Sequence, residues 1–314
     1  MTEAWIVARF IHFAAAMAAF GTGAFRLYAF IGETAPATAM ARAALDGVLT
    51  RIIAALAIAT LVSAAAIIPF VAVEMTASDT AALDPSIWRI VLAETEFGEA
   101  WCWHMGFTLL LLAICLLPAW RWLRGTATLA ALLVLASLGQ VGHAAMDMGG
   151  SNEHVLNQMA HLTAGGLWLG GLLPLGLLLR RALRRDGEPY LAMAQTALPH
   201  FSQMGYVAVA ALLLTGTVNS VMLVGSFRAF VYTPYGRLLL VKIVLFAAMV
   251  GLALVNRFRL MPRLREMADS ARAVRTLGRS VLIEQALGVA ILAVVAVLGT
   301  WPPAIESMGG MAHH

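Results

Sequence analysis

The chain has 314 residues, of which 61% are hydrophobic and only 12% are charged, and its mean hydropathy is +0.83. This composition excludes an ordinary soluble domain, which carries about twice that share of charged residues. The net charge of +4 comes from arginines that lie between apolar blocks, so it suits membrane topology. No nucleic-acid motif is visible, and we expect no nucleic-acid partner.

The apolar residues form eight long blocks, and a run of about 20 apolar residues spans a bilayer as a helix. We therefore predict an all-α, polytopic membrane bundle of eight transmembrane helices, with residues 1–314 forming a single integral membrane domain in the lipid bilayer. The first block lacks the basic start of a secretory signal, which predicts a retained span. The blocks are residues 4–31, 48–73, 100–120, 127–146, 155–179, 202–225, 235–256 and 279–301.

Arginine sets the expected orientation. Sixteen of the 20 arginines fall at one set of alternate connections, which the positive-inside rule assigns to the cytoplasm. An even number of spans then places both termini on the outer, periplasmic side, and residues 302–314 form a short outer tail. The longest outer connection, residues 74–99, is acidic; it is either a solvated face or a rim that attracts cations.

The histidines follow this topology in chain order. His12 lies two to three turns below the outer start of the first block, and His104, beside Met105, lies one turn inside the third. His143 ends the fourth block at the outer surface, and His154 opens the fifth. His161 is seven residues further along, roughly 10 Å deeper on nearly the same face. Seven of the eight histidines thus fall on the outer half, with His200 as the exception.

Methionines accompany these histidines at the outer surface. Met146 and Met148 follow His143, and the tail holds a further set: Met308, Met311, His313 and His314. Thioethers suit Cu(I) and imidazoles suit copper in either oxidation state, whereas hard cations prefer oxygen clusters and zinc more often takes Cys, His and carboxylate. We therefore predict copper ligands, either Cu(I) or Cu(II).

The predicted copper ligands form two groups. The first group captures copper and consists of His143, Met146, Met148 and His154. The second group forms a deeper site and consists of His161 with His104 and His12. Met105 and the tail residues are weaker candidates. Two alternatives stay open: single methionines are apolar filler in a Met-rich chain, and His12 makes a hydrogen bond between helices.

Four other polar or aromatic residues lie within the spans. Trp168 shares the face of His161, while Asn219 and Lys242 lie at similar depth in neighbouring spans. Asn219 and Lys242 either pair with each other or line a pathway. Glu284 lies nearer the cytoplasmic side, where it either forms a structural ion pair with a loop arginine or borders an inward route.

Three stretches carry a family resemblance: "HLTAGGLWLGGLLPL", "FSQMGYVAVAALLLTGTVNS" and "TPYGRLLLVKIVLFAAMVGLALVNRFRLMP". Over residues 155–265 the sequence resembles the CopD family of bacterial copper-resistance membrane proteins. The resemblance implies an eight-span inner-membrane protein that moves copper from periplasm to cytoplasm, beside a separate CopC-type copper-binding partner. It carries over four family positions: His161, Trp168, Asn219 and Lys242.

Three functions compete at this point. The first is copper homeostasis or resistance by a permease that is not an enzyme, since the chain has no P-loop or phosphorylation-type ATPase motif. The second is electron transfer by a b-type haem, with His12 and His161 as an axial pair. The third is a non-transporting partner that delivers copper to a cuproenzyme. A structural protein independent of metal is a further alternative.

Overall fold

The computed structural model describes residues 2–32, 35–117, 122–141, 152–262 and 270–305. These residues form helices joined by short turns, and no strand occurs among them. Eight helical segments are long and apolar enough to cross a membrane. The predicted all-α bundle with eight membrane-spanning helices is therefore confirmed.

The first half of the chain supplies four spans and a short helical cap. The connection expected at residues 74–99 is not an extended loop, because two short helices fill most of it. The elements are α1 (Thr2–Tyr28), α2 (Pro36–Thr76), η1 (Asp79–Leu83), α3 (Pro85–Glu94), α4 (Glu96–Leu116), α5 (Leu123–Ser137) and η2 (Leu138–Gln140).

The second half supplies the other four spans. Two of them contain a π-helical segment, a feature that often marks functional sites. The elements are α7 (Asn152–Gly165), the π-segment η3 (Gly166–Gly170), α8 (Gly171–Ala182), α9 (Glu188–Val224), α10 (Phe227–Tyr232), α11 (Pro234–Val255), the π-segment η4 (Asn256–Leu260) and α12 (Ser270–Leu298).

Several helices begin earlier than the apolar blocks do. Helices α2 and α9 start at Pro36 and Glu188, with a proline in the first turn of each, where a missing N–H costs nothing. Helix α4 starts at Glu96, because the side chain of Thr95 caps it by accepting from the backbone N–H of Gly98 at 2.9 Å. His104 consequently lies about two turns inside this helix, and the expected depth of one turn is wrong.

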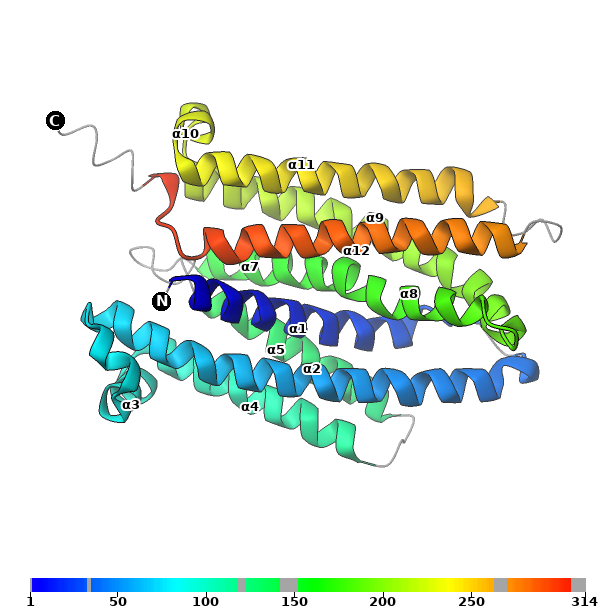
Figure 1. The fold of residues 1–314 in the computed structure, drawn as a ribbon, viewed down its shortest axis with the longest axis horizontal. Helices are drawn as coiled ribbons and strands as arrows, with labels where there is room; N and C mark the ends of the chain where they lie inside the picture. The colour runs from blue at the N-terminus through cyan, green and yellow to red at the C-terminus, as the bar shows by residue number, and fades with distance from the viewer. Residues whose placement is uncertain (1, 33–34, 118–121, 142–151, 263–269, 306–314) are drawn as a thin grey trace.

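Helix α1 runs through the middle of the bundle and packs against α2, α5, η3 and α12 (Figure 1). Its closest approach is to η3, where a Cβ on Gly21 would collide with the backbone of Gly166 and Gly170. The glycines of the fifth span therefore allow close helix packing. The start of α1 and the end of α12 lie at the same end of the bundle, called here the terminal end (Figure 1).

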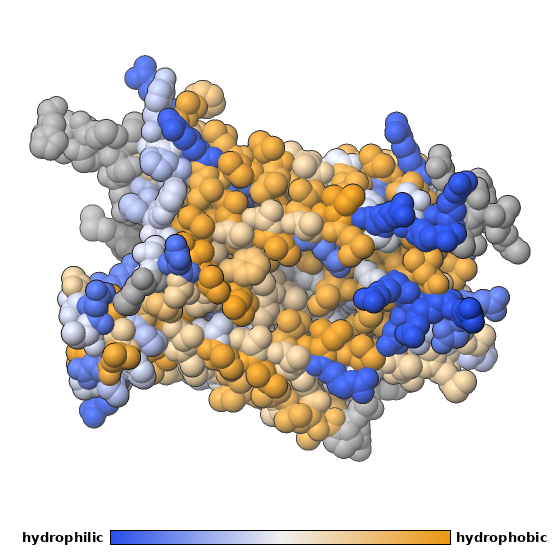
Figure 2. All heavy atoms as spheres, in the orientation of Figure 1, coloured by the Kyte–Doolittle hydropathy of each residue, from blue (hydrophilic) through white to orange (hydrophobic). Residues whose placement is uncertain are grey.

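Arginines gather at the opposite end, which we call the arginine-rich end. It holds Arg26, Arg42 and Arg124, the last turn of α8 and the segment η4. Figure 2 shows an apolar belt between this strongly hydrophilic end and the terminal end. The belt and the eight long helices identify a multi-pass membrane protein.

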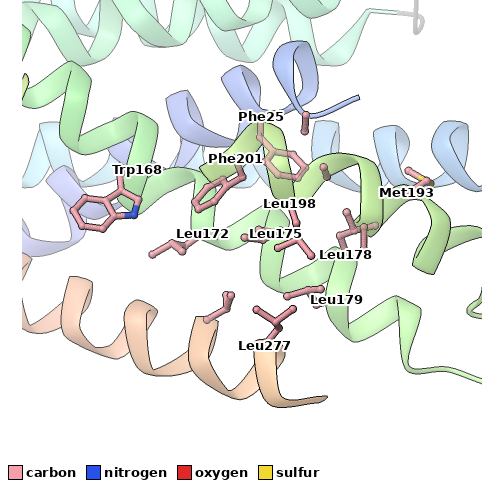
Figure 3. Close-up of a cluster of buried hydrophobic side chains, with 14 of the residues drawn as sticks. Phe25, Trp168, Leu172, Leu175, Leu178, Leu179, Met193, Leu198, Phe201 and Leu277 are labelled. Atoms are coloured by element: carbon pink, nitrogen blue, oxygen red, sulfur yellow. The ribbon is translucent and has the colours of Figure 1, made fainter. Parts of the chain in front are cut away.

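The largest buried cluster lies towards the arginine-rich end. Leu172, Leu175, Leu178 and Leu179 of one helix, α8, pack with residues from α1, α9 and α12, and Trp168 borders them (Figure 3). These four leucines are at most 1% exposed. The cluster therefore fixes the fifth span, including its π-segment, against three neighbours.

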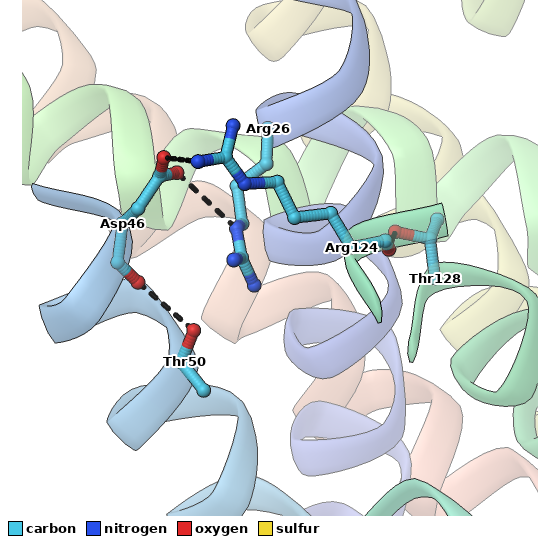
Figure 4. A network of polar contacts seen from close by, with 5 residues as sticks. All are labelled: Arg26, Asp46, Thr50, Arg124 and Thr128. Atoms are coloured by element: carbon cyan, nitrogen blue, oxygen red, sulfur yellow. Dashed lines mark hydrogen bonds and ion pairs between the residues drawn. The ribbon is translucent and has the colours of Figure 1, made fainter. Parts of the chain in front are cut away.

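A buried ionic contact joins three helices at this end. Asp46 of α2 lies 3.4 Å from Arg26 of α1 and 2.6 Å from Arg124 of α5 (Figure 4). The side chains of Arg26 and Asp46 are 7% and 10% exposed. One carboxylate thus compensates two guanidinium groups within the bundle, and its loss leaves both unpaired.

We expect Asp46→Asn to lower the free energy of unfolding by about 2 kcal/mol. The value lies below that of a fully buried pair because Arg124 is 30% exposed. Chemical unfolding in detergent micelles measures it. Asp186→Asn, at an exposed aspartate without an ion pair among the described residues, is the matched control and should leave stability unchanged. Equal stability losses in the two variants would contradict the structural role of Asp46.

Candidate metal sites

Seven of the predicted copper ligands lie outside the described residues, and they stay predictions. They are His143, Met146, Met148, Met308, Met311, His313 and His314. The other predicted residues are all described, and they fall into two separate places. Within the described part of the chain, no three His, Cys, Asp or Glu side chains come together as a metal-binding group.

The first place is a pair of buried histidines in the first half of the chain. His12 of α1 and His104 of α4 are each 1% exposed. Their ring centroids are 4.9 Å apart and the rings are tilted by 52°. Trp101, one turn before His104, stacks on its ring at 5.1 Å and lies 5.2 Å from the ring of His12. Met105 packs at the border of the same cluster.

The hydrogen bonds of His104 fix its tautomer. Its Nδ1 lies 3.1 Å from the carbonyl oxygen of Val134 and 2.9 Å from Oγ of Ser137. A carbonyl oxygen only accepts, and the single hydroxyl proton of Ser137 is donated to Val134 at 2.8 Å. Nδ1 of His104 therefore carries the proton, and in the neutral ring Nε2 carries the lone pair.

His12 is held in the same way. Its Nδ1 lies 3.0 Å from Oγ of Ser63, whose hydroxyl donates to the carbonyl of Ala59 at 2.7 Å. Because that hydroxyl has no second proton, Nδ1 of His12 is the donor. The Nε2 atoms of His12 and His104 are both buried, and neither has a hydrogen-bond partner among the described residues.

An unpartnered buried lone pair costs about 1–3 kcal/mol, and here two of them occur together. Neutral imidazole nitrogens are good ligands for copper. A hydrogen bond from the other ring nitrogen orients such ligands and raises their basicity. The donor atoms of the His12–His104 pair therefore fit a copper ion, although the sequence did not predict that these two residues would form a pair of their own.

The second place is a cavity of about 660 Å³ between α1, α7, α9, α11 and α12, called here the larger cavity. His161, His154, Asn219 and Lys242 line it. Nδ1 of His161 lies 2.8 Å from Oγ1 of Thr215, whose hydroxyl donates to the carbonyl of Ala211 at 2.6 Å. The hydroxyl of Thr215 is therefore already used within α9, and Nδ1 of His161 donates to it. As in the other two histidines, Nε2 is left as the lone-pair nitrogen.

Asn219 does not pair with Lys242. It accepts from Asn157 at 2.8 Å and donates to Gln158 at 3.1 Å, so its partners are amides of α7. No hydrogen bond or ion pair of Lys242 occurs within the described residues. Of the two alternatives for Asn219 and Lys242, the structure favours residues that line a common space.

A smaller cavity of about 100 Å³ lies towards the arginine-rich end, and Trp168, Asn256 and Glu284 line it. Trp168 is 1% exposed, and its ring contacts Phe246, a lining residue of the larger cavity, edge-on at 5.9 Å. These two rings therefore stand between the two cavities.

The ion pair expected for Glu284 is not formed with any described arginine. Glu284 is 3% exposed and accepts a hydrogen bond from Nδ2 of Asn256. The reason is local: Asn256 is the first residue of the π-segment that follows α11, and its amide occupies the carboxylate in place of an arginine. His200, the exception among the eight histidines, donates from Nδ1 to the carbonyl of Ala29 at 3.1 Å and links α9 to the end of α1.

Sequence reasoning missed the side chains that orient the histidines. Ser63, Ser137 and Thr215 are ordinary small residues in apolar helices, and nothing in one sequence shows which histidine each of them faces. It also missed Met17, a buried thioether that lines the larger cavity five residues after His12. A signal existed for Arg9, which also lines the larger cavity, because it is a guanidinium within the first apolar block.

Two family models match the chain. Residues 1–152 match the model described as "Copper resistance protein D-like, N-terminal domain", and residues 195–298 match the model described as "Copper resistance protein D". The first match covers His12 and His104, which lie outside the stretch 155–265 that carried the resemblance. His161 and Trp168 lie between the two matches.

Three relatives were found among curated proteins. Inner membrane protein YebZ of Escherichia coli (strain K12) is 33% identical over 303 residues, which cover 95% of this chain and 98% of that protein. Copper resistance protein D of Pseudomonas syringae pv. tomato is 34% identical over a stretch that covers 70% of this chain and 73% of that protein. Copper transport protein CutJ of Bacillus subtilis (strain 168) is 30% identical over a stretch that covers 70% of this chain and 40% of that protein. No solved structure matches the chain.

Proposed function

The chain belongs to the copper resistance protein D family, and from that premise we propose that it binds copper on buried imidazoles and carries it inward across the bacterial inner membrane. One observation supports this most strongly. His12, His104 and His161 all donate from Nδ1 to a hydroxyl or carbonyl, so that each presents Nε2 as a lone-pair donor. Hydrogen bonding between helices does not require all three histidines to present Nε2 in the same way. Metal binding does, because Nε2 is then the ligand atom.

The proposed route begins at the periplasmic terminal end. Copper is captured by the predicted group His143, Met146 and Met148 and enters the larger cavity at His154. His161 then holds it, and the rings of Trp168 and Phe246 separate it from the smaller cavity at Glu284. The arginine-rich end faces the cytoplasm by the positive-inside rule, which places both termini in the periplasm.

The His12–His104 pair lies away from this route and is a second copper site within the first four spans. No catalytic step is part of the proposal, and no ATP hydrolysis within this chain drives transport. A separate CopC-type protein in the periplasm is the proposed copper donor. The names of two relatives, copper resistance protein D and copper transport protein CutJ, support a copper function of this kind.

Proteoliposomes test the transport step. The vesicles contain an impermeant Cu(I)-chelating dye, and Cu(I) is added outside under reducing conditions. We expect dye signal to rise faster than in protein-free vesicles and to saturate with copper concentration. Copper binding to the protein without any flux above protein-free vesicles would overturn transport and favour the third function, a non-transporting copper-delivery partner.

The haem alternative has less structural support than copper. The ring of His12 packs against His104 and Trp101, and its Nδ1 bonds Ser63. His161 lines the larger cavity instead and faces α9 through Thr215. His12 and His161 therefore do not face each other as an axial pair would, and the His12 and His104 rings leave no room for a porphyrin between them.

The hydroxyl that orients His161 gives a prediction of its own. We expect Thr215→Val to weaken copper binding at His161 about 10–100-fold, the usual cost of losing an outer-shell partner. Competition with a chelator of known affinity measures the change. Thr276→Val removes a hydroxyl that is bonded to its own helix in the same way but is exposed on α12, and it should have no effect. Unchanged affinity in Thr215→Val would show that His161 needs no such support.

A further inference from the structure

The charge of the larger cavity is unexpected for a site that receives a bare copper cation. Two cationic side chains, Arg9 of α1 and Lys242 of α11, line it. None of its described lining residues is aspartate or glutamate. Like charges repel strongly away from water, so a Cu(I) or Cu(II) ion is better accommodated here when an anion accompanies it.

Arg9 is built into the wall of this cavity. It lies on one stripe of α1 with Phe13 and Met17, which also line the cavity, and its Cζ is 5.7 Å from the centroid of the Phe13 ring. A Cβ on Gly299 would collide with the guanidinium, so the glycine makes room for it. Nε of Arg9 is buried without a hydrogen-bond partner among the described residues.

Neither cation is neutralised inside the cavity. Glu74 interacts electrostatically with Arg9, but it is not a lining residue. Lys242 is the only lysine of the chain. It makes no hydrogen bond or ion pair with the described residues, and the amide of Asn219 is engaged by Asn157 and Gln158. Both positive groups are thus available to an anion.

The cavity is also far larger than an ion. Its volume of about 660 Å³ lies within the range of roughly 300–1,000 Å³ that holds small organic ligands. Most of the wall is apolar, with leucines, phenylalanines and valines around a few polar groups. The larger cavity therefore suits an organic molecule that carries negative charge.

We propose that the larger cavity takes copper as a complex with a carboxylate-bearing organic anion. The carboxylates lie against Arg9 and Lys242, which compensate their charge, and Nε2 of His161 is the protein ligand to the metal. This inference rests on the proposed copper function and adds the chemical form of the cargo. Ligand exchange at the metal is the only chemical change, so no electrons are transferred.

Equilibrium dialysis of the purified full chain with copper(II) and radiolabelled citrate, a tricarboxylate probe, tests the proposal. We expect about one citrate retained per chain, and only when copper is present. Lys242→Gln and Arg9→Gln should each weaken citrate retention at least tenfold. Arg228→Gln removes the same charge from an exposed residue of α10 that does not line the cavity, and it should change nothing.

The outcomes separate this inference from the proposed function. Copper held at His161 without citrate, or citrate retained equally by wild type and Lys242→Gln, would overturn the anionic complex and leave copper binding intact. Binding of copper in neither form would overturn both. His161→Asn supplies the background from the His12–His104 pair, and circular dichroism of each variant confirms that the bundle is folded.

Discussion

His104→Asn is expected to abolish copper binding at the His12–His104 pair while the protein stays folded. The asparagine amide can still donate to Val134 and Ser137, as Nδ1 of His104 does at 3.1 and 2.9 Å. It has no counterpart of Nε2, so one of the two imidazole donors is lost. The loss should exceed the roughly 10–100-fold effect of an outer-shell change. Elemental analysis of the purified variant should show one copper fewer per chain.

His200→Asn is the matched control for this variant. His200 also donates from Nδ1 to a backbone carbonyl, that of Ala29 at 3.1 Å, but it lies near the arginine-rich end and away from both sites. Its copper content should equal that of the wild type. Equal copper contents in His104→Asn and wild type would show that the two unpartnered Nε2 atoms do not bind the metal.

His161→Ala is expected to abolish the site in the larger cavity and to reduce copper flux into vesicles to the level of protein-free membranes. His161 is the described lining residue that combines a fixed Nδ1–H with a place in the same cavity wall as Phe246. Without it, copper has no imidazole at this depth. His161→Asn should behave alike, because an amide can bond Thr215 but cannot replace Nε2.

This flux prediction is independent of the His12–His104 pair. His104→Asn should lose copper yet keep a flux within about twofold of wild type, since the pair lies outside the proposed route. Normal flux in His161→Ala would contradict the route through the larger cavity. A matching loss of flux in His104→Asn would instead show that the two sites act in series.

The sequence predicted the fold well because a membrane span has a simple physical signature. About 20 apolar residues are enough to identify one, and all eight spans were found. Helix ends were less accurate, because Thr95 and the prolines of α2 and α9 extend helices into polar sequence where hydropathy gives no signal. The arginine asymmetry was visible from the start, but the ion pair of Arg26 and Arg124 with Asp46 depends on three helices meeting.

The site was predicted as a set of residue types rather than as an arrangement. The placement of His12, His104 and His161 in the outer half of their spans stays a prediction, and eight loop lengths do not determine the order of helices around a bundle. Only the packing of α1 against α2 and α4 on one side and against η3 on the other shows that His12 meets His104, while Met17 reaches the cavity of His161. The roles of Ser63, Ser137 and Thr215 depend on the same contacts.

The most direct test of this account is the copper and haem content of one detergent-purified sample each of wild type, His104→Asn, His161→Asn and the double variant. Copper is measured by elemental analysis and haem by the absorption spectrum. We predict no Soret band, the loss of one copper per chain in each single variant, and the loss of two in the double variant. A Soret band in the wild type, or a double variant with the copper content of the wild type, would contradict copper binding by these imidazoles.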